Sequence, residues 1–282
     1  MRKLLFTLVC FVFASYAIAQ TRKINPAARQ QYDVANGLLN KGKYKECIVQ
    51  FNKALQTDPN FTECHMGLGI AYTNLKQLKT ANEHFTQVIN RFPKDHEAYL
   101  LRGLNYYEMG DTATAFRDID AAVLSKPDYA KGYFNRGVIL FTNGFNDEAL
   151  ADLNNAVFYE KKNAEYHFQR AMIYEAMGNY RSAMADYDTV ITLNPDLYQM
   201  KAYNNRASCR KFFKDVNGAI DDYSAILKKY PGNTVVLINR AFARLSLKDG
   251  EGACEDFKTA EALGNNAAKG FLQKYCKDYF DK

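Results

Sequence analysis

The chain has 282 residues, of which 48% are hydrophobic and 24% are charged, and its formal net charge is +6. This composition is ordinary for a folded protein and excludes an intrinsically disordered chain, which would be less apolar. The charge is too small to indicate a nucleic-acid-binding protein or a protein that adheres to an anionic membrane.

The first twenty residues, MRKLLFTLVCFVFASYAIAQ, have a basic start, an apolar centre and Ala-Ile-Ala before Gln20. This layout is typical of a secretory signal peptide, so we predict that residues 1–19 are cleaved and that 20–27 form a short linker. The alternative is an N-terminal membrane anchor, for which the apolar run is short. The predicted location is periplasmic or extracellular, and the style of the cleavage site is bacterial. The remaining chain, with a net charge of +4 and no other long apolar run, is predicted to have no stable membrane insertion.

Prolines follow the signal segment at a regular spacing. After Pro26 they occupy positions 59, 93, 127, 195 and 231, at separations of 34, 34, 68 and 36 residues. The double gap holds Lys161 where the next proline would be expected. Self-similarity at this period is typical of a repeat architecture.

Seven units in register begin at residues 28, 62, 96, 130, 164, 200 and 234. Small residues recur at the eighth position of each unit: Ala35, Gly69, Gly103, Gly137, Ala171, Ala207 and Ala241. Bulky residues recur at the twenty-fourth position: Phe51, Phe85, Ile119, Leu153, Tyr187, Tyr223 and Phe257. A turn in the middle of each unit and a proline near the end of five of the seven units predict a helix, a tight turn and a second helix.

This spacing of small, aromatic and proline positions resembles the tetratricopeptide repeat, which also has 34 residues. The resemblance implies an all-α fold, a right-handed α-solenoid of seven helix-turn-helix repeats with a C-terminal capping helix. The predicted repeats are 28–61, 62–95, 96–129, 130–163, 164–199, 200–233 and 234–265, and the cap and tail are 266–282. Arg210 and Arg244 depart from the family, because they stand where tyrosine is usual.

An arginine and an aspartate sixteen residues apart recur in the last five repeats. The pairs are Arg102 and Asp118, Arg136 and Asp152, Arg170 and Asp186, Arg206 and Asp222, and Arg240 and Asp256. Since a buried arginine is costly without a carboxylate, we predict structural ion pairs. Pairing within one repeat satisfies all five, whereas pairing with the preceding repeat leaves Asp256 without a partner. Catalytic carboxylates are the alternative, but five separated copies do not converge on one site.

The resemblance also implies a peptide-binding groove along the first helices of the repeats. Its candidate residues are Leu100, Leu104, Tyr107, Phe134, Asn135, Val138, Phe141, Phe168, Gln169, Met172, Asn205 and Asn239. The apolar members form a row, and the amides beside it could bond an extended peptide backbone, because each has a donor and an acceptor. The alternative is that the apolar row packs adjacent first helices together.

Five cysteines follow the predicted cleavage site, an odd number that leaves at least one thiol unpaired within the chain. Cys254 and Cys276 lie about eleven residues on either side of Gly264-Asn265, so antiparallel helices would bring them to a similar height. They are predicted either to form a disulfide that ties down the cap or to be two small core residues.

No pattern of catalytic residues or metal ligands is evident. The histidines, His65, His84, His96 and His167, lack the spacing of a metal site. The sequence therefore predicts no enzyme, no metal and no cofactor. It favours an exported interaction scaffold that binds an extended or helical segment of a protein or peptide partner. The competing hypothesis is a structural subunit that docks its convex face into a cell-envelope or secretion assembly.

Overall fold

A computed structural model describes residues 23–193 and 196–277. The predicted signal peptide (1–19) lies outside the described residues, as do the first residues of the predicted linker. Within the described ranges the regular secondary structure is helical and includes no strand. The prediction of an all-α fold is confirmed.

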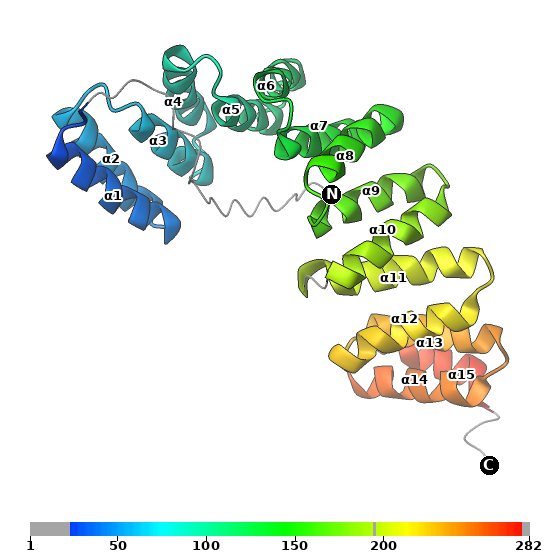
Figure 1. Cartoon of the computed structure of the whole chain (residues 1–282). Coiled ribbons are helices and arrows are strands. Elements are labelled where there is room, and N and C mark those ends of the chain that lie inside the picture. The colour runs from blue at the N-terminus through cyan, green and yellow to red at the C-terminus, as the bar shows by residue number, and fades with distance from the viewer. Residues whose placement is uncertain (1–22, 194–195, 278–282) are drawn as a thin grey trace. The chain divides into compact units, whose positions relative to one another are not determined.

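Fifteen helices occur in the described residues (Figure 1). They are α1 (Pro26–Asn40), α2 (Tyr44–Thr57), α3 (Glu63–Asn74), α4 (Leu78–Arg91), α5 (His96–Glu108), α6 (Thr112–Ser125), α7 (Ala130–Thr142), α8 (Asn146–Tyr159), α9 (Ala164–Ala176), α10 (Tyr180–Leu193), α11 (Asp196–Phe212), α12 (Val216–Lys229), α13 (Thr234–Ser246), α14 (Gly250–Ala262) and α15 (Asn266–Tyr275). This number of helices is consistent with about seven helix pairs and one further helix.

The chain divides into two compact units, and the boundary between Gly132 and Tyr133 falls within α7. In the first unit α3 packs against α2 and α4, and α5 packs against α4 and α6. In the second unit α9 packs against α8 and α10, α11 against α10 and α12, and α13 against α12 and α14. Each of these first helices therefore contacts its own partner helix and the one before it, which is the arrangement of a linear repeat array.

Local sequence signals set the ends of the helices. Asp111, Asp215 and Asp249 each precede a second helix, and each side chain accepts a hydrogen bond from a backbone N–H of its first turn. Between the two helices of a pair the backbone enters the left-handed region, for example at Gly144 with φ 87°. The N–H of Phe145 then bonds the carbonyl of Leu140, which closes the helix end.

The core follows the small and bulky columns of the sequence. Alanines of the eighth column and the rings of Phe51, Phe85, Tyr187, Tyr223 and Phe257 are buried, at 0% or 1% exposure. Glycine is needed where the approach is closest. A Cβ added at Gly137 would lie 2.3 Å from a methyl carbon of Leu153, so the first helix sits directly on the bulky residue of the second.

The last helix, α15, packs against α14 at the end of the second unit. Phe271, Leu272 and Tyr275 of α15 contact the buried cluster that contains Phe257. Helix α15 thus covers apolar side chains that the last helix pair would otherwise expose.

Candidate functional site

The five predicted arginine–aspartate pairs each lie inside one helix pair. In every case the arginine Nε donates to one carboxylate oxygen and Nη2 donates to the other, over 2.5–3.1 Å. The aspartate side chains are at most 8% exposed and those of the arginines at most 24%. We call this bidentate pair the clamp. It fixes the spacing between the two helices of a repeat by charge-assisted bonds.

The clamp also has a third bond, which sequence reasoning missed. In four of the clamps the remaining nitrogen, Nη1, donates to a polar residue on the second helix of the preceding repeat. The acceptors are Thr86 for Arg102 (2.8 Å), Asn154 for Arg170 (3.0 Å), Asp188 for Arg206 (2.5 Å) and Ser224 for Arg240 (3.0 Å). None of these acceptors is the clamp aspartate of the preceding repeat, so the third bond differs from the second pairing geometry that the sequence presents.

Charge and burial oppose one another at the clamp aspartates. Burial acts to raise the pKa of Asp186, but hydrogen bonds from Arg170 and His167 outweigh burial and hold that pKa below its usual value. His167 Nδ1 lies 2.8 Å from Asp186 Oδ1, and its Nε2 lies 3.0 Å from the carbonyl oxygen of Lys161. This histidine is thus a structural partner of the clamp.

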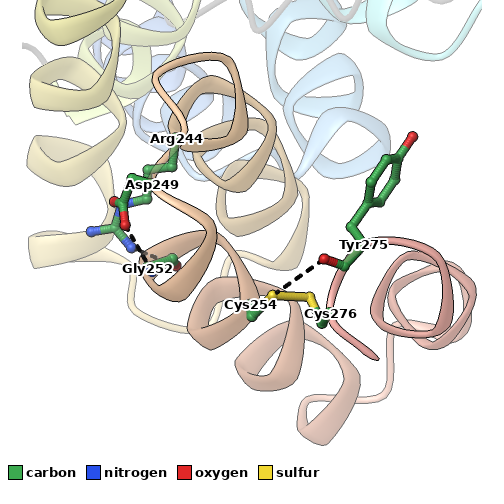
Figure 2. Close-up of a disulfide and its surroundings, with 6 residues drawn as sticks. All are labelled: Arg244, Asp249, Gly252, Cys254, Tyr275 and Cys276. Carbon is green, nitrogen blue, oxygen red and sulfur yellow. Dashed lines mark hydrogen bonds and ion pairs between the residues drawn. A yellow bond between two sulfur atoms is a disulfide. The ribbon is translucent and has the colours of Figure 1, made fainter. Parts of the chain in front are cut away.

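Arg210 and Arg244, which stand where the family usually has tyrosine, have a common role. The Nη1 of each donates to the carbonyl of a glycine in the next helix, Gly218 at 2.7 Å and Gly252 at 2.8 Å. Figure 2 shows the second of these contacts, beside Asp249. Both arginines also reach their clamp aspartate, at 2.9 Å and 3.0 Å. The substitution therefore preserves the regular packing of the last two repeats.

The predicted groove residues divide by burial. Leu100 and Phe168 are 0% and 5% exposed, so the structure assigns them to packing rather than to an open surface. The Phe168 ring lies between Tyr187 and Tyr198, with ring centroids 5.8 and 5.3 Å away. The other apolar candidates are half-buried: Leu104 and Tyr107 in the first unit, and Phe134, Val138, Phe141 and Met172 in the second.

The amide column is partly used by the protein itself. Asn135 is only 7% exposed. Asn205 Nδ2 donates to the Tyr187 hydroxyl at 3.0 Å, and that hydroxyl donates to Glu175 at 2.7 Å. Gln169 and Asn239 are half-buried. Among the predicted groove residues of the second unit, those that remain accessible and unused are thus the amides of Gln169 and Asn239 and the half-buried apolar side chains.

A pocket lies elsewhere in the second unit, at the connection between α8 and α9. Its volume is about 810 Å³, and it is open to solvent. It is lined by Phe158, Tyr159, Glu160, Lys161, Lys162, Asn163, Ala164, Glu165, Leu193 and Tyr198. The sequence analysis did not identify this pocket, because its walls come from segments about forty residues apart. The one available signal was Lys161, which stands where other repeats have proline.

Comparisons with known proteins agree with this architecture. Family profiles described as Tetratricopeptide repeat match residues 63–95, 100–165 and 164–197. The chain is a tetratricopeptide repeat protein. The prediction made from the 34-residue period is confirmed. Tetratricopeptide repeats typically form non-enzymatic scaffolds for protein–protein interaction, and they bind protein or peptide partners.

Solved tetratricopeptide repeat structures share the fold. One is the C-terminal part of a repeat-containing protein from Cytophaga hutchinsonii, with a TM-score of 0.71 and 19% identity over 86% of this chain and 99% of that one. PilF of Pseudomonas aeruginosa has a TM-score of 0.63 and 17% identity, and the match covers 73% of this chain and 93% of that one. YrrB, described as having an unusual peptide-binding site, has a TM-score of 0.59 and 16% identity, and the match covers 68% of this chain and 99% of that one. A search of curated proteins finds no match.

Among the described residues, no helix has the length and apolar character needed to cross a membrane. The same residues include no group of three or more histidine, cysteine, aspartate or glutamate side chains placed to hold a metal ion.

The second repeat has a histidine pair instead of a clamp. His65 and His84 approach with their Nδ1 atoms 2.9 Å apart, and the His84 ring stacks on Tyr72. Only one proton fits between the two nitrogens, so this contact excludes the state in which both rings are protonated. Burial and the neighbouring His65 lower the pKa of His84 to about 4, and burial also lowers the pKa of His65.

This pair predicts a loss of stability in mild acid. Because the pKa of His84 is lower in the folded than in the unfolded state, the unfolded state binds more protons below about pH 6.5. The contribution to stability is present above that pH and is lost as the pH falls toward 4. Between pH 7.5 and 5, calorimetry should show a larger fall in Tm for the wild type than for His84→Gln. If Tm falls equally with pH in the two proteins, the histidine pair is not the cause of the acid sensitivity.

The cysteines include one disulfide, between Cys254 and Cys276, with their Cα atoms 5.7 Å apart (Figure 2). It joins α14 to the residue that follows α15. The other cysteines of the described residues, Cys47, Cys64 and Cys209, are buried and unpaired. Burial raises the pKa of Cys47 to about 11 and that of Cys64 and Cys209 to about 12, so these thiols are poor nucleophiles.

Proposed function

We propose that the chain is an exported, non-enzymatic scaffold that binds an extended or helical peptide segment of another protein along the first helices of its repeats. The observation that carries the proposal is the half-buried apolar row Phe134, Val138, Phe141 and Met172 in the second unit. Phe134, Phe141 and Met172 pack against buried core residues, and all four side chains keep part of their surface in water.

Side-chain amides on the first helices support a peptide as the ligand. Gln169 lies between Phe168 and the clamp residue Arg170 in α9, and Asn239 has the same place in α13. Each side-chain amide offers one donor group and one acceptor, which matches the alternating groups of a peptide backbone. Burial of the apolar row would supply the affinity, at roughly 25 cal/mol per Å² before ordering costs are subtracted.

The proposed export has two supports. The first is the signal-peptide layout of residues 1–19. The second is the disulfide between Cys254 and Cys276, because structural disulfides are found mainly in oxidising compartments outside the cytosol.

The test is peptide selection followed by charge insertion. Random dodecapeptides are selected on purified residues 20–282, and the enriched peptides are measured by fluorescence anisotropy. Val138→Glu with Met172→Glu should weaken binding by about tenfold or more, since it places two charges in the apolar row. Phe168 is unsuitable as a test position because it is buried.

The matched control puts the same two charges on the second helix of a repeat. Ala151 and Asn155 of α8 are exposed, so Ala151→Glu with Asn155→Glu should leave peptide binding unchanged. If the enriched peptides lose affinity only for this control variant, the alternative of docking through the second helices is supported instead.

A further inference from the structure

The pocket between α8 and α9 has exposed aromatic walls. Phe158 is 65% exposed and Tyr159 is 41% exposed, and their rings meet edge to face with centroids 5.2 Å apart. Leu193 and Tyr198 also line the pocket. Adjacent exposed aromatic side chains leave apolar surface in water, which commonly marks a recognition site.

These aromatic residues are not a requirement of the repeat. The position of Phe158 is held by Thr192 in the next repeat and by Lys228 in the one after. The connecting segment is also exceptional, because Lys161 replaces the proline found at 59, 93, 127, 195 and 231. The exposed aromatics and the missing proline therefore occur together at one connection.

The carboxylates and the ammonium groups that line the pocket differ in whether they already have partners within the protein. Glu160 accepts a hydrogen bond from Asn163 at 3.1 Å, and Glu165 accepts one from the Tyr198 hydroxyl at 2.7 Å. The lysines are both exposed. The Lys161 ammonium lies over the Phe158 ring, 5.7 Å from its centroid. Neither Lys161 nor Lys162 forms an ion pair with a carboxylate among the described residues. The two carboxylates of the pocket thus already accept hydrogen bonds from neighbouring side chains, whereas its two ammonium groups have no carboxylate partner.

We propose that this pocket binds an acidic peptide segment that carries an aromatic side chain. The ligand's ring packs against Phe158 and Tyr159, and its carboxylates bond the ammonium groups of Lys161 and Lys162. The site goes beyond the proposed function, since its lining residues include none of the half-buried apolar row. The pocket would give the scaffold a second peptide-binding site, one that prefers acidic segments.

The test uses a fluorescein-labelled octapeptide of alternating glutamate and phenylalanine, with anisotropy as the readout. The wild type should bind this peptide about tenfold more tightly than a peptide with lysine in place of glutamate, or serine in place of phenylalanine. Lys161→Glu with Lys162→Glu should raise Kd about tenfold or more, and so should Phe158→Ser. Because these residues are exposed, circular dichroism melting should show an unchanged fold.

The control for net charge is Lys53→Glu with Lys79→Glu, two exposed lysines of α2 and α4. It changes the charge of the protein equally and should bind the acidic peptide as the wild type does. Equal losses in both charge variants would overturn the proposal, because binding would then follow net charge. Loss in Val138→Glu with Met172→Glu, but not in the pocket variants, would also overturn it and would place the peptide on the first helices.

Discussion

Replacing Asp222 with alanine is expected to destabilise the protein strongly. Its carboxylate is 2% exposed and bonds both Arg206 and Arg210, so the change leaves two partly buried guanidinium groups without their shared partner. Removing one member of a buried ion pair costs about 3–5 kcal/mol. For a chain of this size we expect a fall in Tm of about 10 °C in a circular dichroism melt.

The matched control is Asp188→Ala, which removes another carboxylate from Arg206. Asp188 is 57% exposed, and exposed ion pairs are worth about 1 kcal/mol or less, so its Tm should change by only a few degrees. If the two variants melt at the same temperature, the bidentate bond inside the repeat is not the stabilising contact that its geometry indicates.

Removing the disulfide is expected to release the last helix. In Cys254→Ala with Cys276→Ala, α15 keeps its apolar contacts but loses the cross-link that closes a segment with a sequence separation of 22. Closing a loop of this length contributes about 3 kcal/mol. Amide hydrogens of α15 should therefore exchange about a hundredfold faster, as measured by mass spectrometry.

Two comparisons isolate the effect of the cross-link. Cys209→Ala removes a buried, unpaired cysteine from α11 and should leave exchange in α15 unchanged. Dithiothreitol should accelerate exchange in the wild type to the rate of the double variant and should not affect the double variant. Slow exchange of α15 in the reduced protein would show that apolar packing alone holds the cap.

The fold could be predicted because its signals are local and repeated. Small residues at the eighth position allow close approach, bulky ones at the twenty-fourth fill the core, and Asp or Asn caps begin many helices. The clamp was also predictable, since arginine and aspartate occur together in five repeats and are both absent from the first two, where Val34 and Leu68 replace arginine.

The surface was harder to predict because it depends on how the helices cross. Phe134 and Phe168 have the same position in successive repeats, yet only Phe168 is buried. Phe134 stacks on the ring of Tyr166, whereas Phe168 contacts two rings, those of Tyr187 and Tyr198. The third bond of the clamp was missed because its acceptors share no side chain type. The pocket beside Lys161 requires residues from four helices, which no sequence period brings together.

The third bond of the clamp has a consequence for how such a chain can change in length during evolution. Its acceptor differs between repeats but is polar in each: Thr86, Asn154, Asp188 and Ser224. Loss of residues 164–199 would bring Arg206 to the place of Arg170, opposite Asn154, which can accept the same bond. Gene segments that encode whole repeats can therefore be duplicated or deleted in frame without leaving an unmatched guanidinium at the new junction.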